Sequence, residues 1–151
     1  MLFDDSKFTI LLVEDNDDDA LLLERAIRKN GIKNAMNRMR DGLDAVHYLE
    51  GTDKFADRTV FPFPEVIILD LKMPRMGGLE FLDWVDKHPE HRVIPTIVLT
   101  SSRLDSDVDC SYRLGANTFM VKPANFDELA AMVRKIHDYW AVSVKPKKRT
   151  L

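Results

Sequence analysis

A continuous run of large apolar residues at 66–69 leads straight into Asp70. The run is rich in β-branched residues and does not alternate with polar ones, which is typical of a strand buried on both faces of a parallel sheet. Pro64 before it and Pro74 after it leave little room for a helix. Asp70 is therefore predicted at the carboxyl end of a strand, where open α/β sheets bind their ligands.

Similar apolar segments predict four further strands, at 8–13, 35–39, 96–99 and 118–121. Apolar residues at helical spacing predict five helices between and after them, beginning near Asn16, Asp41, Gly77, Asp105 and Asn125. We interpret the acids at 17–19 as first-turn residues that favour the start of the first helix. Five strands alternating with five helices predict a doubly wound α/β fold, with a five-stranded parallel sheet covered on both sides.

The composition is that of an ordinary globular protein. With 151 residues, we expect a single domain over 1–151, with a core at about 8–140 and a basic tail at 141–151. A net charge of −3 neither favours nor excludes a nucleic-acid partner. Cys110 is the single cysteine, so no internal disulfide can form, which fits a cytoplasmic protein. The apolar runs are too short to predict a signal peptide or a membrane span.

Chemically useful side chains follow four of the predicted strands. Glu14 and Asp15 follow the first, Asp70 the third, Thr100 the fourth and Lys122 the fifth. Because the carboxyl ends of parallel strands lie along one edge, these side chains should converge. Carboxylates brought together need a cation, and oxygen ligands favour Mg²⁺, or Mn²⁺. A lysine and a hydroxyl beside them would suit a phosphoryl group, with one aspartate as the nucleophile of an acyl phosphate.

Four motifs together resemble the signature of receiver domains of two-component response regulators. They are Val-Glu-Asp-Asn at 13–16, Leu-Asp-Leu-Lys-Met-Pro at 69–74 with Gly78, Leu-Thr-Ser at 99–101 and Val-Lys-Pro at 121–123. The resemblance covers about 8–140 and implies the flavodoxin-like receiver fold. The long irregular stretch at 51–64 and the aromatic end at 136–140 resemble stand-alone, single-domain regulators of phytochrome-type kinases. Such a protein is a phosphoacceptor, not an enzyme in the usual sense, because it catalyses only its own phosphorylation and dephosphorylation.

The resemblance also implies a role for each matching residue. Asp70 would accept the phosphoryl group from a phosphohistidine of a sensor histidine kinase. Asp15 and Asp70 would bind Mg²⁺ together with the backbone carbonyl of Lys72, and Glu14 would hold a metal-bound water or ligand. Thr100 and Lys122 would contact the phosphoryl oxygens.

Further roles follow from the same resemblance. Thr100 and Phe119 would form the coupled conformational switch, and the Lys122–Pro123 peptide bond would be cis. Lys72 lies two residues after Asp70, at a position where the family tunes the lifetime of the acyl phosphate, and we expect the same here.

Output is expected through protein contacts, because too few residues follow the last predicted helix for a DNA-binding domain. Some relatives form homodimers through the last two helices and the last strand, and Tyr112, Phe119 and Trp140 are candidates for that surface. Two other functions stay open. A phosphatase or mutase would typically carry an acid two residues after the nucleophile, where this chain has Lys72. A receiver-like scaffold would keep the fold without being phosphorylated.

Overall fold

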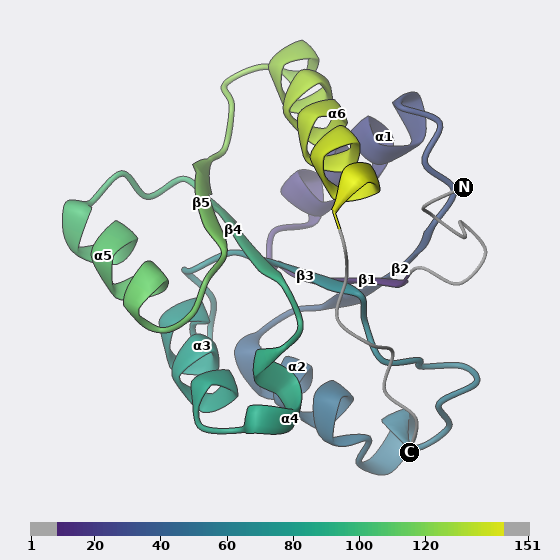
Figure 1. The fold of residues 1–151 in the computed structure, drawn as a ribbon, viewed down its shortest axis with the longest axis vertical. Helices are drawn as coiled ribbons and strands as arrows, with labels where there is room; N and C mark the ends of the chain where they lie inside the picture. The colour runs from purple at the N-terminus through teal and green to yellow at the C-terminus, as the bar shows by residue number, and fades with distance from the viewer. Residues whose placement is uncertain (1–8, 144–151) are drawn as a thin grey trace.

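The computed structural model describes residues 9–143, which form a five-stranded parallel sheet between two layers of helices (Figure 1). The strands are β1 (Thr9–Val13), β2 (Ala35–Met39), β3 (Val66–Leu69), β4 (Thr96–Thr100) and β5 (Thr118–Val121). Their order is β2-β1-β3-β4-β5, and every neighbouring pair is parallel. The predicted doubly wound α/β fold is confirmed. The predicted first residue of β1, Phe8, and the basic tail from 144 onward lie outside the described residues.

Between 9 and 143 the chain forms six α-helices, one more than predicted. They are α1 (Asp17–Lys29), α2 (Gly42–Glu50), α3 (Gly78–Asp86), α4 (Pro89–Arg92), α5 (Asp105–Arg113) and α6 (Phe126–Val142), with a 3₁₀ turn, η1 (Asp53–Phe55). The additional helix, α4, has four residues and begins with a proline. It is too short to show a periodic apolar pattern, which is why the sequence does not predict it. None of these helices is long and apolar enough to cross a membrane.

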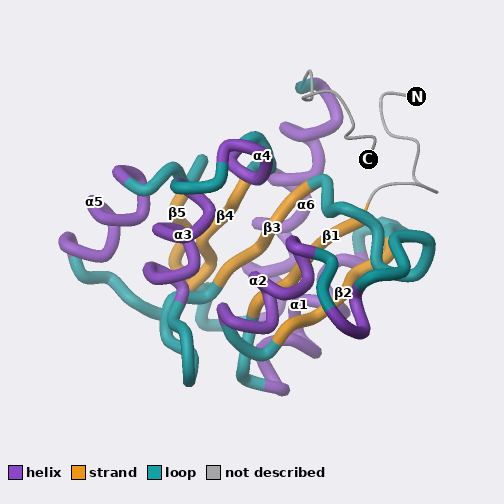
Figure 2. Tube along the Cα trace, turned by 90° about the horizontal axis from the view of Figure 1, so that it is seen from below, coloured by secondary structure: helices purple, strands orange, loops and turns teal. Residues whose placement is uncertain are grey.

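The sheet is buried on both faces, as the unbroken apolar runs predict. Helices α1 and α6 cover one face, and α2 to α5 lie on the other; Figure 2 views the strands from the side of α2 and α3. Successive residues of β1 alternate between the two cores. Ile10 and Leu12 pack in the core under α1 and α6, whereas Leu11 and Val13 pack in the core under α2 and α3. Burial on both sides fixes the strand register, because a slip of one residue would exchange the two faces.

The irregular stretch at 51–64 folds back onto the end of α2. The guanidinium of Arg58 donates hydrogen bonds to the backbone carbonyls of Tyr48 and Leu49, each at 2.7 Å. These carbonyls belong to the last turn of α2, where helical N–H groups run out. The Tyr48 carbonyl also accepts a hydrogen bond of 3.2 Å from the Gly51 N–H. The same guanidinium lies 4.2 Å from the ring centroid of Phe63. Arg58 therefore orders a stretch in which no regular element was predicted.

A glycine allows α3 to begin directly beside the end of β3. The Gly78 N–H donates to the Leu71 carbonyl at 2.8 Å. A Cβ atom at Gly78 would collide with the Asp70 carbonyl and with the Cα of Leu71, so no larger residue fits without moving the backbone. This close approach holds the turn that follows Asp70.

Candidate functional site

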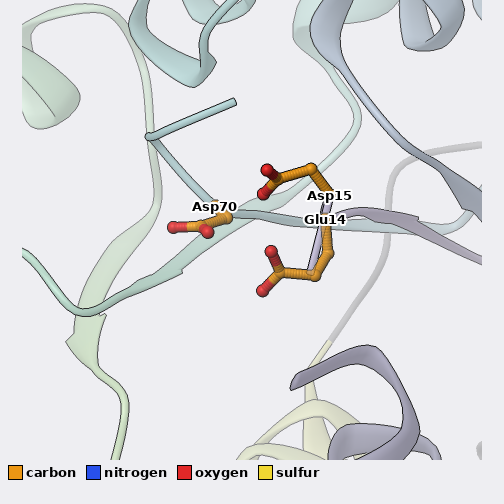
Figure 3. A group of neighbouring side chains, drawn as sticks. All are labelled: Glu14, Asp15 and Asp70. Carbon is orange, nitrogen blue, oxygen red and sulfur yellow. The ribbon is translucent and has the colours of Figure 1, made fainter. Parts of the chain in front are cut away.

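Three carboxylates meet at the carboxyl ends of β1 and β3. Glu14 and Asp15 directly follow β1, and Asp70 directly follows β3. They lie close together because Val13 and Leu69, the last residues of these strands, are register partners in the parallel pair. One oxygen from each of the three lies within 4.8 Å of the others, and Figure 3 shows the carboxyl groups around a common space. Glu14 is 3% exposed and Asp70 is 9% exposed. Oxygen donors this close, without histidine or cysteine among them, fit a hard divalent cation.

Lys122 supplies the positive charge beside these acids. Its Nζ donates to Glu14 Oε1 at 2.6 Å, to Asp19 Oδ2 at 2.8 Å and to Asp70 Oδ2 at 3.3 Å. An ammonium has three N–H donors, so all three are engaged. The Lys122 backbone N–H donates to the Thr100 carbonyl at 2.8 Å, which places the end of β5 beside the end of β4. Three carboxylates therefore contact this lysine, and Asp15 lies beside two of them, Glu14 and Asp70.

The pKa values of Glu14 and Lys122 are both raised, and in each case burial and the neighbouring charges act together or against each other. Burial raises the pKa of Glu14 to about 7, the hydrogen bond from Lys122 opposes the rise, and the negative charge of Asp70 adds to it. Burial by itself would lower the pKa of Lys122. Its hydrogen bonds to Asp19 and Glu14 outweigh that effect, so its pKa lies above the ordinary value of 10.5. The lysine is therefore charged at neutral pH, while the excess of acids is only partly neutralised.

Thr100 and Phe119 lie on adjacent strands next to this cluster. Thr100 is 1% exposed, and its Oγ1 accepts a long hydrogen bond of 3.4 Å from the Ser102 N–H. Phe119 is half-buried and lies two register positions away on β5, because Thr100 pairs with Val121. The Phe119 N–H donates to the Tyr112 hydroxyl at 3.0 Å. The two proposed switch residues are thus near neighbours in the sheet.

The turn after Asp70 is fixed at both ends. Asp70 Oδ1 accepts a hydrogen bond of 2.8 Å from the Leu71 N–H, which orients the carboxylate. Lys72 follows in this turn with its side chain exposed. Farther along, Arg75 has a φ of 61° and donates through Nε to Asp41 Oδ2 at 2.7 Å. The turn that carries the Lys72 carbonyl is therefore attached to the start of α2.

Two expectations change with the structure. The Lys122–Pro123 peptide bond is trans, since residues 9–143 contain no cis peptide. The expectation of a cis bond is wrong. The trans form is the intrinsically favoured isomer by about 0.5–1 kcal/mol, and from it Lys122 still reaches its three acceptors.

The second change concerns Asp19, which was interpreted only as a first-turn acid. It does lie in the first turn of α1, but its carboxylate bonds Lys122. Asp17, Asp18 and Asp19 look alike as first-turn acids in the sequence, so no local signal distinguishes Asp19.

A doubly wound sheet with acids after β1 and β3 and a lysine after β5 is the architecture of phosphorelay receiver modules. Residues 10–134 match the Response regulator receiver domain, and the chain belongs to this family. The match spans most of the described residues, including every residue of the carboxylate cluster and Lys122. The protein is therefore a response-regulator receiver, a signalling module of two-component phosphorelays.

Named relatives match this chain over most of their length. The chain is 35% identical to the probable methanogenesis regulatory protein FilR2 of Methanothrix harundinacea, covering 88% of this chain and 83% of FilR2. It is 34% identical to the response regulator Rcp1 of Synechocystis sp., covering 89% of this chain and 90% of Rcp1.

Solved structures of response regulators have a similar fold. The Mn²⁺-bound form of Rcp1 has a TM-score of 0.82 at 33% identity, covering 93% of this chain and 99% of that one. The phosphorylated cyanobacterial phytochrome response regulator RcpA has a TM-score of 0.85 at 31% identity, with the same coverage.

Proposed function

We propose that Asp70 is the phosphoacceptor of this receiver and that a sensor histidine kinase supplies the phosphoryl group. The observation that carries the proposal is the position of the Asp70 carboxylate. It lies 3.3 Å from the Lys122 ammonium and within 4.8 Å of both Glu14 and Asp15. An aspartate held between a cation and a potential metal site is equipped to attack phosphorus.

The proposed transfer is a displacement at phosphorus. An Asp70 oxygen attacks the phosphorus of a phosphohistidine, a P–O bond forms, the P–N bond breaks, and the imidazole leaves with the electron pair. Lys122 and Thr100 donate hydrogen bonds to the phosphoryl oxygens, where negative charge accumulates. Attack of water on phosphorus breaks the P–O bond to Asp70, releases inorganic phosphate and restores the Asp70 carboxylate.

A divalent ion fits the donor set on this rim. Glu14, Asp15 and Asp70 would hold Mg²⁺, with the Lys72 carbonyl as a further ligand, and Mn²⁺ would suit the same oxygens. The ion would supply positive charge opposite the phosphoryl oxygens. Support comes from the spacing of the three carboxylates and from the similarity to Rcp1, whose structure is a Mn²⁺-bound form.

The proposed output is a conformational change read by other proteins. When the Thr100 hydroxyl turns from the Ser102 N–H to a phosphoryl oxygen, the half-buried Phe119 ring can follow it inward. Homodimerisation through α5, β5 and α6 is the proposed readout, supported by the exposed Tyr112 on α5. The partner kinase is proposed to be of the phytochrome type, because of the similarity to RcpA. Both partners would meet in the cytoplasm.

The test is labelling by acetyl phosphate in the presence of Mg²⁺. Intact-mass measurement should show the addition of one phosphoryl group, hydroxylamine should remove it, and chelation of the metal should prevent it. Asp70→Asn keeps the size of the side chain but lacks the nucleophilic oxygen, and should stay unlabelled. Labelling of Asp70→Asn would disprove the assignment. A wild-type protein that neither becomes labelled nor binds Mg²⁺ would favour the scaffold function instead.

The proposed dimerisation is tested separately. Light scattering should show a larger mass when beryllofluoride, a phosphoryl mimic, is added with Mg²⁺. A Tyr112→Ala variant should weaken that change. An unchanged monomer mass in both states would rule out dimerisation as the output.

A further inference from the structure

Asp19 contacts the site from α1 and lies outside the four sequence motifs at 13–16, 69–74, 99–101 and 121–123. Its Oδ2 lies 2.8 Å from the Lys122 Nζ, closer than Asp70 Oδ2 at 3.3 Å. The Asp19 side chain is 39% exposed, whereas that of Lys122 is 16% exposed. The contact joins residues 103 positions apart and is one of three that together engage the whole ammonium group.

The local backbone leaves the Asp19 carboxylate available for this contact. Asp19 is the third residue of α1, a position at which a Glu or Gln commonly bonds back to the N–H of the N-cap residue. Here the N-cap is Asn16, and its N–H donates instead to Glu14 Oε2 at 3.2 Å. Asn16 Oδ1 accepts from the Asp19 N–H at 2.9 Å, which fixes the Asp19 backbone. The cap thus fixes the backbone of Asp19 and leaves its carboxylate to bond Lys122.

Asp19 differs from the other two acceptors of Lys122. Glu14 and Asp70 both belong to the carboxylate group that can hold a metal ion, together with Asp15, and Asp19 does not. A divalent cation in that group would take up oxygens of Glu14 and Asp70 and would repel the ammonium, since both are positive. The Asp19 carboxylate is the acceptor that remains with Lys122.

We propose that Asp19 is a positioning residue, which keeps the Lys122 ammonium beside Asp70 when a metal ion and a phosphoryl group occupy the other carboxylates. This inference rests on the proposed function of Asp70. Asp19 itself touches neither the metal nor the phosphoryl group and acts through Lys122. Its negative charge balances the lysine at the moment when the other two anions are engaged elsewhere.

The first test compares initial rates of labelling by acetyl phosphate at saturating Mg²⁺. Asp19→Ala should be labelled about tenfold more slowly, as expected for loss of one charge-assisted hydrogen bond. Asp19→Asn keeps an acceptor oxygen and should recover part of the rate. Asp18→Ala is the matched control, because it removes the same charge from the same helix turn at an exposed residue, and it should stay within about twofold of wild type. Equal losses in the Asp18 and Asp19 variants, or no loss in Asp19→Ala, would overturn the proposal.

The second test asks whether Asp19 acts through Lys122. In a Lys122→Ala background, Asp19→Ala should cause no further loss of labelling rate, because the group it positions is absent. A full additional loss in the double variant would overturn the proposal.

A third measurement does not depend on phosphorylation. In the Mg²⁺-loaded wild type, the Lys122 ammonium should give a slowly exchanging ¹⁵N resonance, and Asp19→Ala should lose it. Retention of that resonance in Asp19→Ala overturns the positioning role even if Asp70 is labelled. If wild type is not labelled but the resonance is still lost in Asp19→Ala, the proposed function of Asp70 is rejected and the positioning role of Asp19 stands.

Discussion

Two clusters of ion pairs in this molecule each have one basic residue, but they differ in the number of acidic residues around it. In the first, Lys122 contacts Glu14, Asp19 and Asp70. In the second, Arg75 connects the turn after β3 to the start of α2 through two acids. Both join loops at the same end of the sheet, and both include acids in the first turns of helices.

In the second cluster, both acids contact Arg75 directly. Arg75 Nε contacts Asp41 Oδ2 at 2.7 Å, and Nη2 contacts Asp44 Oδ1 at 3.0 Å. The other oxygen of Asp41 accepts from the Asp44 N–H at 2.9 Å and caps α2. Every charge there has a partner, so the cluster has a structural role.

The first cluster has an excess of acid. Three carboxylates share one ammonium, and Asp15 adds a fourth acid beside Glu14 and Asp70. Burial is the main reason that the pKa of Glu14 rises to about 7. The Arg75 cluster has one acid more than it has cations, whereas the Lys122 cluster, with Asp15, has three more. The comparison teaches that the size of the excess of acid, more than the number of ion pairs, separates a ligand site from a structural cluster. The following variants test that distinction.

The largest effect is expected from Lys122→Met. Without metal, the free energy of unfolding should fall by about 3 kcal/mol, because partly buried carboxylates lose their counter-charge. Affinity for Mg²⁺ should rise, since the competing cation is gone, and Mg²⁺ should restore much of the lost stability. Urea unfolding with and without Mg²⁺, together with calorimetric titration, measures both. A variant as stable as wild type without metal would contradict the picture of an unbalanced site.

A smaller effect should follow from adding Mg²⁺ to the wild type. At ten times its dissociation constant, the ion should raise the free energy of unfolding by about 1.4 kcal/mol. Asp15→Asn should abolish most of this gain, because it removes one of the three ligands. Thermal unfolding at graded Mg²⁺ concentrations is the measurement, and an equal gain in both proteins would place the ion elsewhere.

Asp41→Ala tests the cluster around Arg75. It removes the helix cap and the partner of Arg75, and should cost about 1 kcal/mol of unfolding free energy. The loss should be the same with and without Mg²⁺, in contrast to Lys122→Met. A loss that Mg²⁺ repairs would mean that the two clusters are coupled through the turn after β3.

The smallest effect concerns the charge of Asp41. Burial by itself would raise its pKa, but the hydrogen bonds from Arg75 and from the Asp44 N–H outweigh it, so the pKa lies below 3.8. Because the folded pKa is lowered, the charge stabilises the protein above pH 3.8, and this is lost as the pH falls through the folded pKa. Asp41→Asn keeps the cap and should cost about 0.5 kcal/mol at neutral pH. Urea unfolding should show the difference shrinking in acid; a constant difference would contradict it.

The fold and most of the site could be predicted because they follow from local patterns. Unbroken apolar runs mark strands buried on both sides, and parallel strands bring their ends to one edge. Asp70 and Lys122 therefore come together whatever their separation in sequence. The motif resemblance adds the roles of these residues, which no periodicity reveals.

The missed features depend on tertiary contacts. Asp17, Asp18 and Asp19 are equivalent as first-turn acids, yet Asp17 pairs with Arg38 at 2.8 Å and Asp19 pairs with Lys122. Sequence spacing does not show which side of α1 faces β5. The order at 51–64 likewise depends on Arg58 reaching carbonyls about ten residues earlier in the chain.

The contact between Tyr112 and Phe119 has a consequence for how copies of this protein can associate. β5 is one of the two edge strands of the sheet, and edge strands offer unpaired N–H groups to which a foreign strand can add. The phenol oxygen of Tyr112 already occupies the outward N–H of Phe119 at 3.0 Å. An incoming strand would have to displace this side chain before it could pair with the Phe119 N–H, so the bond hinders strand addition at this position of β5.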